Sequence, residues 1–288
     1  MTQTEPLSIL LPKFIESLKQ KGRSPSTLLA YRADLDQLTT YLAKKGKTLP
    51  SQIDLADLES FKESLLSQNY TPKSASRKLN AVKTFFRYLK ETGSITADPS
   101  KDVTHPKIES ATPKFLSQLE YRALRDITRA DIRIHAIIEL ILQTGMRISE
   151  VATLKMANVT DHEIAIEAYA TQPERVVPMN APAKEALDQY LKERPQTDSP
   201  FVFVSKNGKS LAVRNIRASI DRFMQKAEIP QYSVNDLRTT FIVENLKRGV
   251  DLVTISHAAG HKRLSTTERY LELANIKEPG KKQKLEEL

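Results

Sequence analysis

Residues 233–273 read SVNDLRTTFIVENLKRGVDLVTISHAAGHKRLSTTERYLEL, and the rest of the chain is organised around this stretch. Apolar side chains recur at helical spacing through residues 241–259, which predicts helices with one buried face. Two polar clusters flank the apolar part, the first around Arg238 and the second from Gly260 to Tyr270. We therefore expect an apolar support that holds both polar clusters rigidly.

The second cluster carries the signals of a helix end and a helix start. Gly260 predicts the end of one helix, because glycine adopts the left-handed C-cap conformation without strain. Ser265 with Glu268 three residues later matches the capping box that begins a helix. On this pattern Tyr270 lies about a turn and a half into the new helix, which fixes the position of its hydroxyl group.

The residue types in these clusters favour phosphate chemistry. Arg238 presents paired donors that match phosphate oxygens, His261 can donate a further hydrogen bond, and Tyr270 can attack phosphorus to form a covalent intermediate. A second cation appears upstream, at Arg147 within the segment TGMRISEV. There Gly145 is expected to end an apolar helix and Arg147 to open the next one.

In order and spacing, TGMRISEV, LRTTF and GHKRLSTTERY resemble the tyrosine recombinase (phage integrase) family, and most closely its short Xer-like members. The resemblance implies that Tyr270 attacks a DNA phosphate, forms a 3′-phosphotyrosyl link and releases a 5′-hydroxyl, and that another strand's 5′-hydroxyl reverses the step. It also implies that Arg147 and Arg238 stabilise the transition state, with His261 adding a hydrogen bond. Because the bond energy stays in the covalent link, no cofactor is expected.

Two positions depart from the family pattern. Aligned on Arg175 and the Val-Pro pair after it, Ala170 stands where the family usually has a lysine that protonates the leaving oxygen. Asn235 stands three residues before Arg238, where the family usually has a histidine, and its amide cannot exchange a proton near neutrality. General acid–base catalysis supplies about 10²–10⁴ in rate, so we expect a slow enzyme or one that borrows another group. The candidate substitutes are Lys206, Lys209 and Arg175.

Composition narrows the class of partner. The chain has 288 residues and a formal net charge of +9, which favours nucleic acid over a membrane surface. No uninterrupted apolar run is long enough to span a membrane, and the charged first twenty residues do not match a signal peptide. The chain has no cysteine, and its five histidines lack metal-binding spacing, so we expect no metal site. A cytoplasmic, nucleoid-associated protein fits these features.

Helical signals in the first part of the chain predict a four-helix unit. Ser24 before Pro25 and Thr71 before Pro72 begin the second and fourth helices, and Asp54 or Asp57 begins the third. The proline-rich stretch after these helices reads as a linker. The predicted domains are 1–103, a helical DNA-binding domain that also resembles the family's N-terminal domain, a linker over 104–114, and a catalytic domain over 115–288.

The expected fold class is mainly α with a small β-hairpin or sheet insert, arranged as a two-domain DNA clamp. Alternating residues over 164–169 and 175–178 predict the insert, either as a hairpin or as part of a three-stranded sheet. Basic residues on the fourth helix and on a helix expected over 211–226 have two interpretations, a solvated surface or contacts with the DNA backbone. The residues predicted to contact DNA are Arg77, Lys83, Arg87, Arg175, Arg214 and Arg217.

Two main functions and a more distant third follow from these patterns. The first is a site-specific recombinase that acts on double-stranded DNA as a tetramer, alone or with a second recombinase. The second is a relative that keeps DNA binding but has lost efficient cleavage; a relaxing topoisomerase with the same nucleophile is a more distant third. The charged tail over 281–288 has two interpretations, a helix that docks on a neighbouring protomer or a solvent-exposed end.

Overall fold

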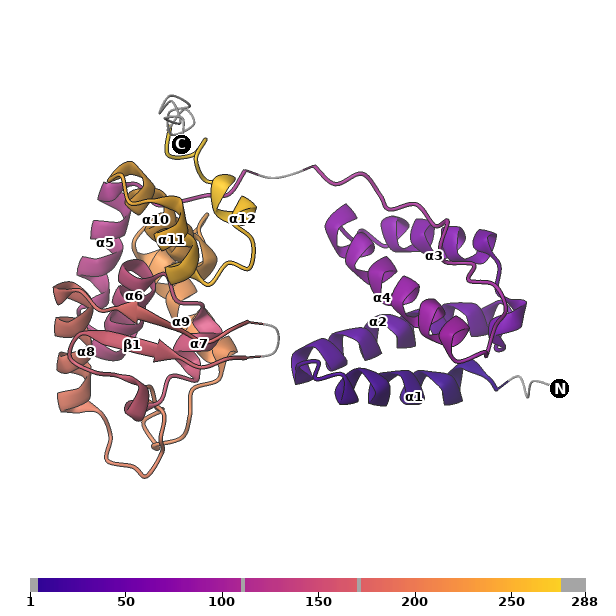
Figure 1. Ribbon diagram of the computed structural model, residues 1–288, viewed down its shortest axis with the longest axis horizontal. Coiled ribbons are helices and arrows are strands. Elements are labelled where there is room, and N and C mark those ends of the chain that lie inside the picture. The colour runs from indigo at the N-terminus through magenta and orange to yellow at the C-terminus, as the bar shows by residue number, and fades with distance from the viewer. Residues whose placement is uncertain (1–4, 110–111, 170–171, 276–288) are drawn as a thin grey trace, which may run out of the picture. The chain divides into compact units, whose positions relative to one another are not determined.

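The computed structural model describes residues 5–109, 112–169 and 172–275. It divides into two compact units, residues 1–111 and 112–288, and the boundary falls inside the predicted linker. Helices make up most of both units and a two-stranded hairpin belongs to the second, which confirms the predicted fold class (Figure 1). Two expectations, for Ala170 and for the tail over 281–288, lie outside the described residues.

The described part of the N-terminal unit contains four α-helices, and the starts of the last three match the sequence signals. The helices are α1 (Leu7–Gln20), α2 (Pro25–Lys44), α3 (Leu55–Ser67) and α4 (Pro72–Glu91), with the short 3-10 helix η1 (Pro50–Gln52) before α3. The side chains of Ser24, Asp54 and Thr71 each accept a hydrogen bond from a backbone N–H in the first turn. Asp54 and Asp57 are the two predicted starts of α3, and the N-cap of this helix is Asp54.

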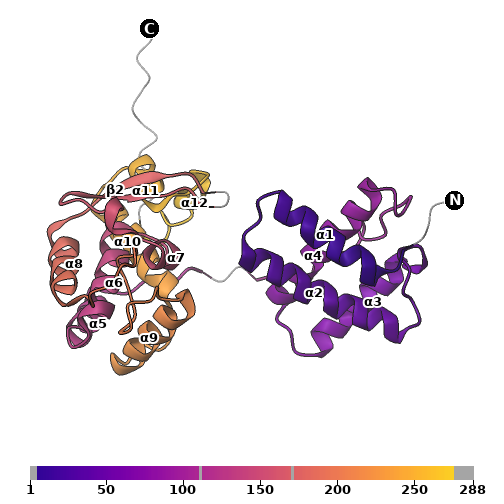
Figure 2. The same cartoon turned by 90° about the horizontal axis from the view of Figure 1, so that it is seen from below.

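Helix α4 packs against the other three helices of this unit (Figure 2). The apolar side chains of Leu79, Val82, Phe86 and Leu89 form a buried stripe, and Phe85 joins it against Phe14 of α1 with ring centroids 5.2 Å apart. The basic side chains of α4 lie on the other faces of the helix.

The segment that follows α4 is fastened to the N-terminal unit as far as His105. Val103 is buried in the core of the unit, the Thr104 N–H donates to Glu59 Oε1 at 2.8 Å, and His105 Nδ1 lies 2.9 Å from Ser76 Oγ. The attachment therefore extends two residues beyond the predicted domain end at residue 103.

The C-terminal unit is built around one buried helix. Its elements are α5 (Gln118–Thr128), α6 (Ile132–Thr144), α7 (Ile148–Ala152), η2 (Met156–Asn158), β1 (Glu163–Ile166), β2 (Arg175–Pro178), α8 (Ala181–Glu193), α9 (Val213–Lys226), α10 (Val234–Lys247), α11 (Leu252–Ala259) and α12 (Ser265–Glu268). Helix α6 packs against α5, α7, α8, α9 and α10, so most of its residues are buried.

Strands β1 and β2 form an antiparallel hairpin in which Ile164 pairs with Val177. Of the two predicted forms of the insert, the structure has the hairpin and no third strand among the described residues. The segment around Phe201 makes isolated bridges, from Phe201 to Lys155 and from Val204 to Ser210. Strand β2 lies beside α11 (Figure 2), which brings the hairpin to the stretch that the sequence singled out.

Candidate active site

Two glycines shape the backbone of the site, as the sequence predicts. Gly145 ends α6 and Gly260 ends α11, and both have left-handed backbones, with φ of 66° and 63°. A side chain at Gly145 would overlap the ring of Phe241, and one at Gly260 would meet the guanidinium of Arg175 at 2.7 Å. Only glycine combines this backbone with such close neighbours.

Three guanidinium groups converge on the carboxyl end of α11 and donate to three successive backbone carbonyls. The pairs are Arg175 with Ala258 at 2.9 Å, Arg147 with Gly260 at 2.8 Å, and Arg238 with Ala259. The last carbonyls of a helix lack partners within it and carry its negative pole. The end of α11 therefore attracts all three cations, although they come from three distant parts of the chain.

The carboxylate of Glu150 joins two of these arginines. It accepts two hydrogen bonds from Arg175, at 2.9 and 2.8 Å, and one from the Arg147 side chain at 2.9 Å. Burial opposes ionisation of Glu150, but the hydrogen bonds from Arg175 and from the Arg147 backbone outweigh it and hold its pKa below the usual value. Glu150 thus remains a carboxylate and fixes the orientation of Arg147.

The site carries excess positive charge. One carboxylate, that of Glu150, faces the guanidiniums of Arg147, Arg175 and Arg238. Burial and the neighbouring Arg147 lower the pKa of Arg238 to about 9, so Arg238 is still charged at neutral pH. Two of the five N–H donors of Arg147 and two of those of Arg238 are used within the protein, which leaves donors for an anion.

His261 stands next to this cation cluster and is neutral. Its Nδ1 lies 2.8 Å from the hydroxyl of Thr267, and its ring is nearly parallel to that of Tyr270, with centroids 6.3 Å apart and an angle of 9°. Burial and the charge of Arg238 lower the pKa of His261 to about 4. A neutral imidazole has one N–H to donate, so the tautomer decides which nitrogen acts as the donor.

The position of Tyr270 differs from the prediction. Helix α12 ends at Glu268, and Tyr270 follows it in a run of turns. Ser265 is not the N-cap, because Leu264 before it already has helical angles of −58° and −36°. Tyr270 is half-buried against an apolar cluster that contains Ile242 and Ile255, so tertiary packing rather than a long helix holds its ring.

Arg175 requires a correction, because it was predicted to contact DNA or to act as a substitute proton donor. Its side chain is only 2% exposed and is bound to Glu150 and Ala258. A guanidinium in this setting is shielded from DNA and cannot release a proton. Its observed contacts instead tie β2 to α7 and to the end of α11.

Lys206 and Lys209 lie far from the site in this structure. Their turn is connected to Val204, whose carbonyl accepts a hydrogen bond from Arg133 at 3.0 Å. Arg133 is near the start of α6, whereas the site lies beyond its end, and α6 is about 20 Å long. Asn235 lies on the first turn of α10, one helical turn before Arg238, and its side chain is exposed.

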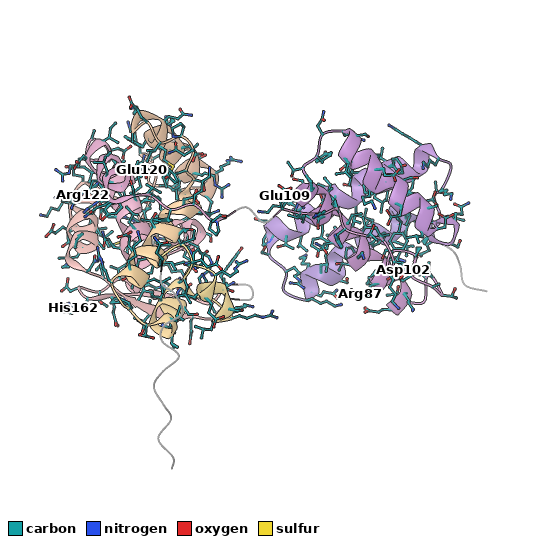
Figure 3. All side chains as sticks on the ribbon, turned by 90° about the horizontal axis from the view of Figure 1, so that it is seen from above. Arg87, Asp102, Glu109, Glu120, Arg122 and His162 are labelled. Atoms are coloured by element: carbon teal, nitrogen blue, oxygen red, sulfur yellow. The ribbon has the colours of Figure 1, made fainter. Side chains whose placement is uncertain are left out.

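The other residues predicted to contact DNA lie on helices α4 and α9. Arg87 is exposed on α4 and projects from the surface of the N-terminal unit (Figure 3). Arg77 is exposed but is held in a two-pronged ion pair by the buried Asp34, and Lys83 donates to the Lys101 carbonyl at 3.2 Å. On α9, Arg214 and Arg217 are exposed.

The described residues contain no cluster of three or more histidine, aspartate or glutamate side chains that could hold a metal ion. None of the helices in the same ranges combines the length and hydropathy needed to cross a membrane.

Comparison with known proteins matches both units of the chain. Residues 114–276 match the phage integrase family, and residues 11–93 match the phage integrase N-terminal SAM-like domain. A relative named tyrosine recombinase XerC, from Chlorobaculum parvum, is 30% identical over 298 residues, covering 90% of this chain and 89% of the relative.

Solved structures show the same similarity. The XerA recombinase is 27% identical with a TM-score of 0.53, covering 91% of this chain and 92% of its own. Lambda integrase, solved as a tetramer bound to a Holliday junction, has a TM-score of 0.74 at 17% identity, covering 93% of this chain and 78% of its own. At that identity the second similarity concerns the fold alone.

Proposed function

The chain belongs to the phage integrase family of tyrosine recombinases, and from this premise we propose that it cleaves and rejoins double-stranded DNA at specific sites through a 3′-phosphotyrosyl intermediate. One observation carries the proposal. Arg147, Arg238 and His261 meet at the end of α11, and the ring of Tyr270 lies parallel to that of His261. A nucleophile, two cations and a neutral donor are the groups that phosphoryl transfer requires.

In the proposed reaction the Tyr270 oxygen attacks phosphorus as the bond from phosphorus to the 5′-oxygen breaks. The phenol gives its proton to water, and the leaving oxygen takes a proton from water to become a 5′-hydroxyl. Arg147 and Arg238 bind the non-bridging oxygens with their remaining donors, and His261 donates one further hydrogen bond. The 5′-hydroxyl of a second strand then attacks the same phosphorus and releases Tyr270.

The weakest step is protonation of the leaving oxygen. Within the described ranges, no lysine hydrogen-bonds to the site arginines, His261 or Tyr270, and Asn235 cannot supply a proton near neutrality. A missing general acid reduces the rate by about 10²–10⁴. We therefore propose that cleavage is slow, and that the protein binds its site much faster than it cuts it.

The missing proton donor for the leaving oxygen also favours a second candidate, a relative that occupies its DNA site without efficient cleavage. In both cases the partner is double-stranded DNA bound by a positive chain of net charge +9. We propose self-association on DNA, with four protomers or with a second recombinase, as in the tetramer of lambda integrase on a Holliday junction, and a nucleoid-associated location follows from the proposed DNA binding.

A covalent trap separates the two candidates. A binding site is first selected from a random duplex library, and a labelled copy with a nick beside the cleavage position is incubated with the protein and boiled in detergent. Recombinase activity predicts a labelled adduct that is absent in Tyr270→Phe and present in Tyr169→Phe, a matched control at an exposed tyrosine. Binding without any adduct would reject cleavage and favour the second candidate.

A further inference from the structure

We propose that Thr267 is a positioning residue that determines which nitrogen of His261 carries the proton. Its hydroxyl donates to Nδ1, and therefore Nε2–H is the donor that His261 offers to an anion in the site. The assignment of that anion as a DNA phosphate rests on the proposed function; the assignment of the tautomer does not.

The first argument is the burial of the Thr267 hydroxyl. The residue is 0% exposed, and its Oγ1 lies 2.8 Å from His261 Nδ1. That contact is the only hydrogen bond of the Thr267 side chain within the described ranges. The hydroxyl proton of Thr267 therefore has one available acceptor, which is Nδ1.

The second argument compares the two tautomers. If Nδ1 carried the proton, it would donate to Oγ1, and the buried hydroxyl proton of Thr267 would be left without an acceptor. A buried donor without a partner loses its solvation and gains nothing in return. If Nδ1 is bare, the Thr267 hydroxyl donates to it and both groups are satisfied.

The third argument concerns the charge of the ring. Burial together with Arg238 and Arg147 lowers the pKa of His261 to about 4, so the ring has only one proton at neutral pH. With Nδ1 bare, this proton is on Nε2. In the described part of the chain Nε2 has no hydrogen-bond partner, and it is not among the buried side-chain atoms that lack one, so Nε2 is open at the surface of the site.

The tautomer matters because the neighbouring arginines already fix the position of the anion. A bare Nε2 would direct a lone pair at a negatively charged oxygen, whereas Nε2–H directs a donor at it. Thr267 thus makes His261 a hydrogen-bond donor to the anion, as Arg147 and Arg238 are. It does so without adding a charge to a site that already has an excess of positive charge.

The tautomer is tested directly by NMR on the full-length protein labelled with ¹⁵N in its histidines. A long-range ¹H–¹⁵N spectrum at pH 7 distinguishes a protonated ring nitrogen from a bare one, and comparison with His261→Gln assigns the signals. The expected result is a bare Nδ1 and a protonated Nε2. A protonated Nδ1, or a ring protonated on both nitrogens, would overturn the proposal whatever the enzymatic activity.

Variants at the hydroxyl extend the test to function. Thr267→Val keeps the shape of the side chain and removes its donor, so we expect a mixture of both tautomers and about tenfold slower formation of the covalent adduct, the effect of one ordinary hydrogen bond. Thr267→Ser should restore the single Nε2–H tautomer and the wild-type rate of adduct formation. Thr266→Val, at the half-buried neighbouring threonine, should leave the tautomer and the rate unchanged. A pure Nε2–H tautomer and unchanged kinetics in Thr267→Val would refute the role of Thr267.

The failure of the two proposals can be distinguished. If the wild-type protein forms no adduct but shows a bare Nδ1, the proposed recombinase function fails and the tautomer assignment stands. If the adduct forms and Nδ1 is protonated, the function stands and the role of Thr267 is wrong.

Discussion

Replacing Glu150 by glutamine should strongly destabilise the C-terminal unit. The Arg175 side chain is 2% exposed, and both carboxylate oxygens of Glu150 accept its hydrogen bonds. Removing one partner of a buried ion pair costs about 3–5 kcal/mol, because the remaining charge has no compensation. For a unit of this size about 2–4 °C is lost per kcal/mol, so Tm should fall by about 6–20 °C.

Calorimetry of the full chain measures this effect, and an exposed ion pair provides the matched control. Glu167 pairs with Lys155 at 2.8 Å, but both side chains are well exposed, so Glu167→Gln should leave Tm close to that of the wild type. A second variant, Arg175→Met combined with Glu150→Gln, should recover part of the loss because the 2% exposed guanidinium of Arg175 is no longer left without a carboxylate. The account is refuted if the Tm of every thermal transition in Glu150→Gln is as close to the wild-type value as it is in the Glu167→Gln control.

Three further predictions concern the glycine turn, the histidine and the DNA surface. Gly145→Ala should destabilise the protein by more than about 1 kcal/mol in urea unfolding, because φ is +66° and the ring of Phe241 occupies the space. Burial and Arg238 lower the pKa of His261 from 6.5 to about 4, so the unfolded chain binds more protons between these values; stability should fall as the pH decreases from 6.5 to 4, and His261→Gln should remove that part of the slope. Arg87→Ala, at an exposed position on α4, should weaken DNA binding and reduce its salt dependence by about one ion, and an unchanged salt slope would exclude a phosphate contact there.

Local signals in the sequence were sufficient for the helices and for the two turns that frame the site. Ser24, Asp54 and Thr71 begin helices because each side chain satisfies a free backbone N–H. Gly145 and Gly260 end helices because they alone tolerate the left-handed conformation beside a packed side chain. The caps involve residues that are neighbours in the sequence, and the glycine turns depend on local backbone conformation, which is why the pattern predicts them.

The role of Arg175 was missed although the sequence contained a signal for it. In strand β2 the buried positions alternate, and Arg175 shares the inward face with Val177. An arginine at such a position needs a buried acid, and Glu150 fits that role. The sequence alone instead predicts that Arg175 contacts DNA or replaces the missing proton donor.

Other features depend on contacts between distant segments and had no local signal. The carbonyls at the end of α11 accept hydrogen bonds from arginines up to 113 positions away in sequence. Such contacts are visible only in the folded chain. The capping pattern at Ser265 failed because Leu264 before it already has helical backbone angles.

The central claim, that Arg147, Arg238, His261 and Tyr270 act on one phosphodiester, is tested most directly by changing the charge of that phosphate. On ordinary DNA, Arg238→Ala should reduce covalent adduct formation by about 10²–10³. When one non-bridging oxygen at the cleavage position is replaced by an uncharged methyl group, the same substitution should cost far less, because the charge that Arg238 stabilises is gone. An equal loss on both DNAs would contradict the claim.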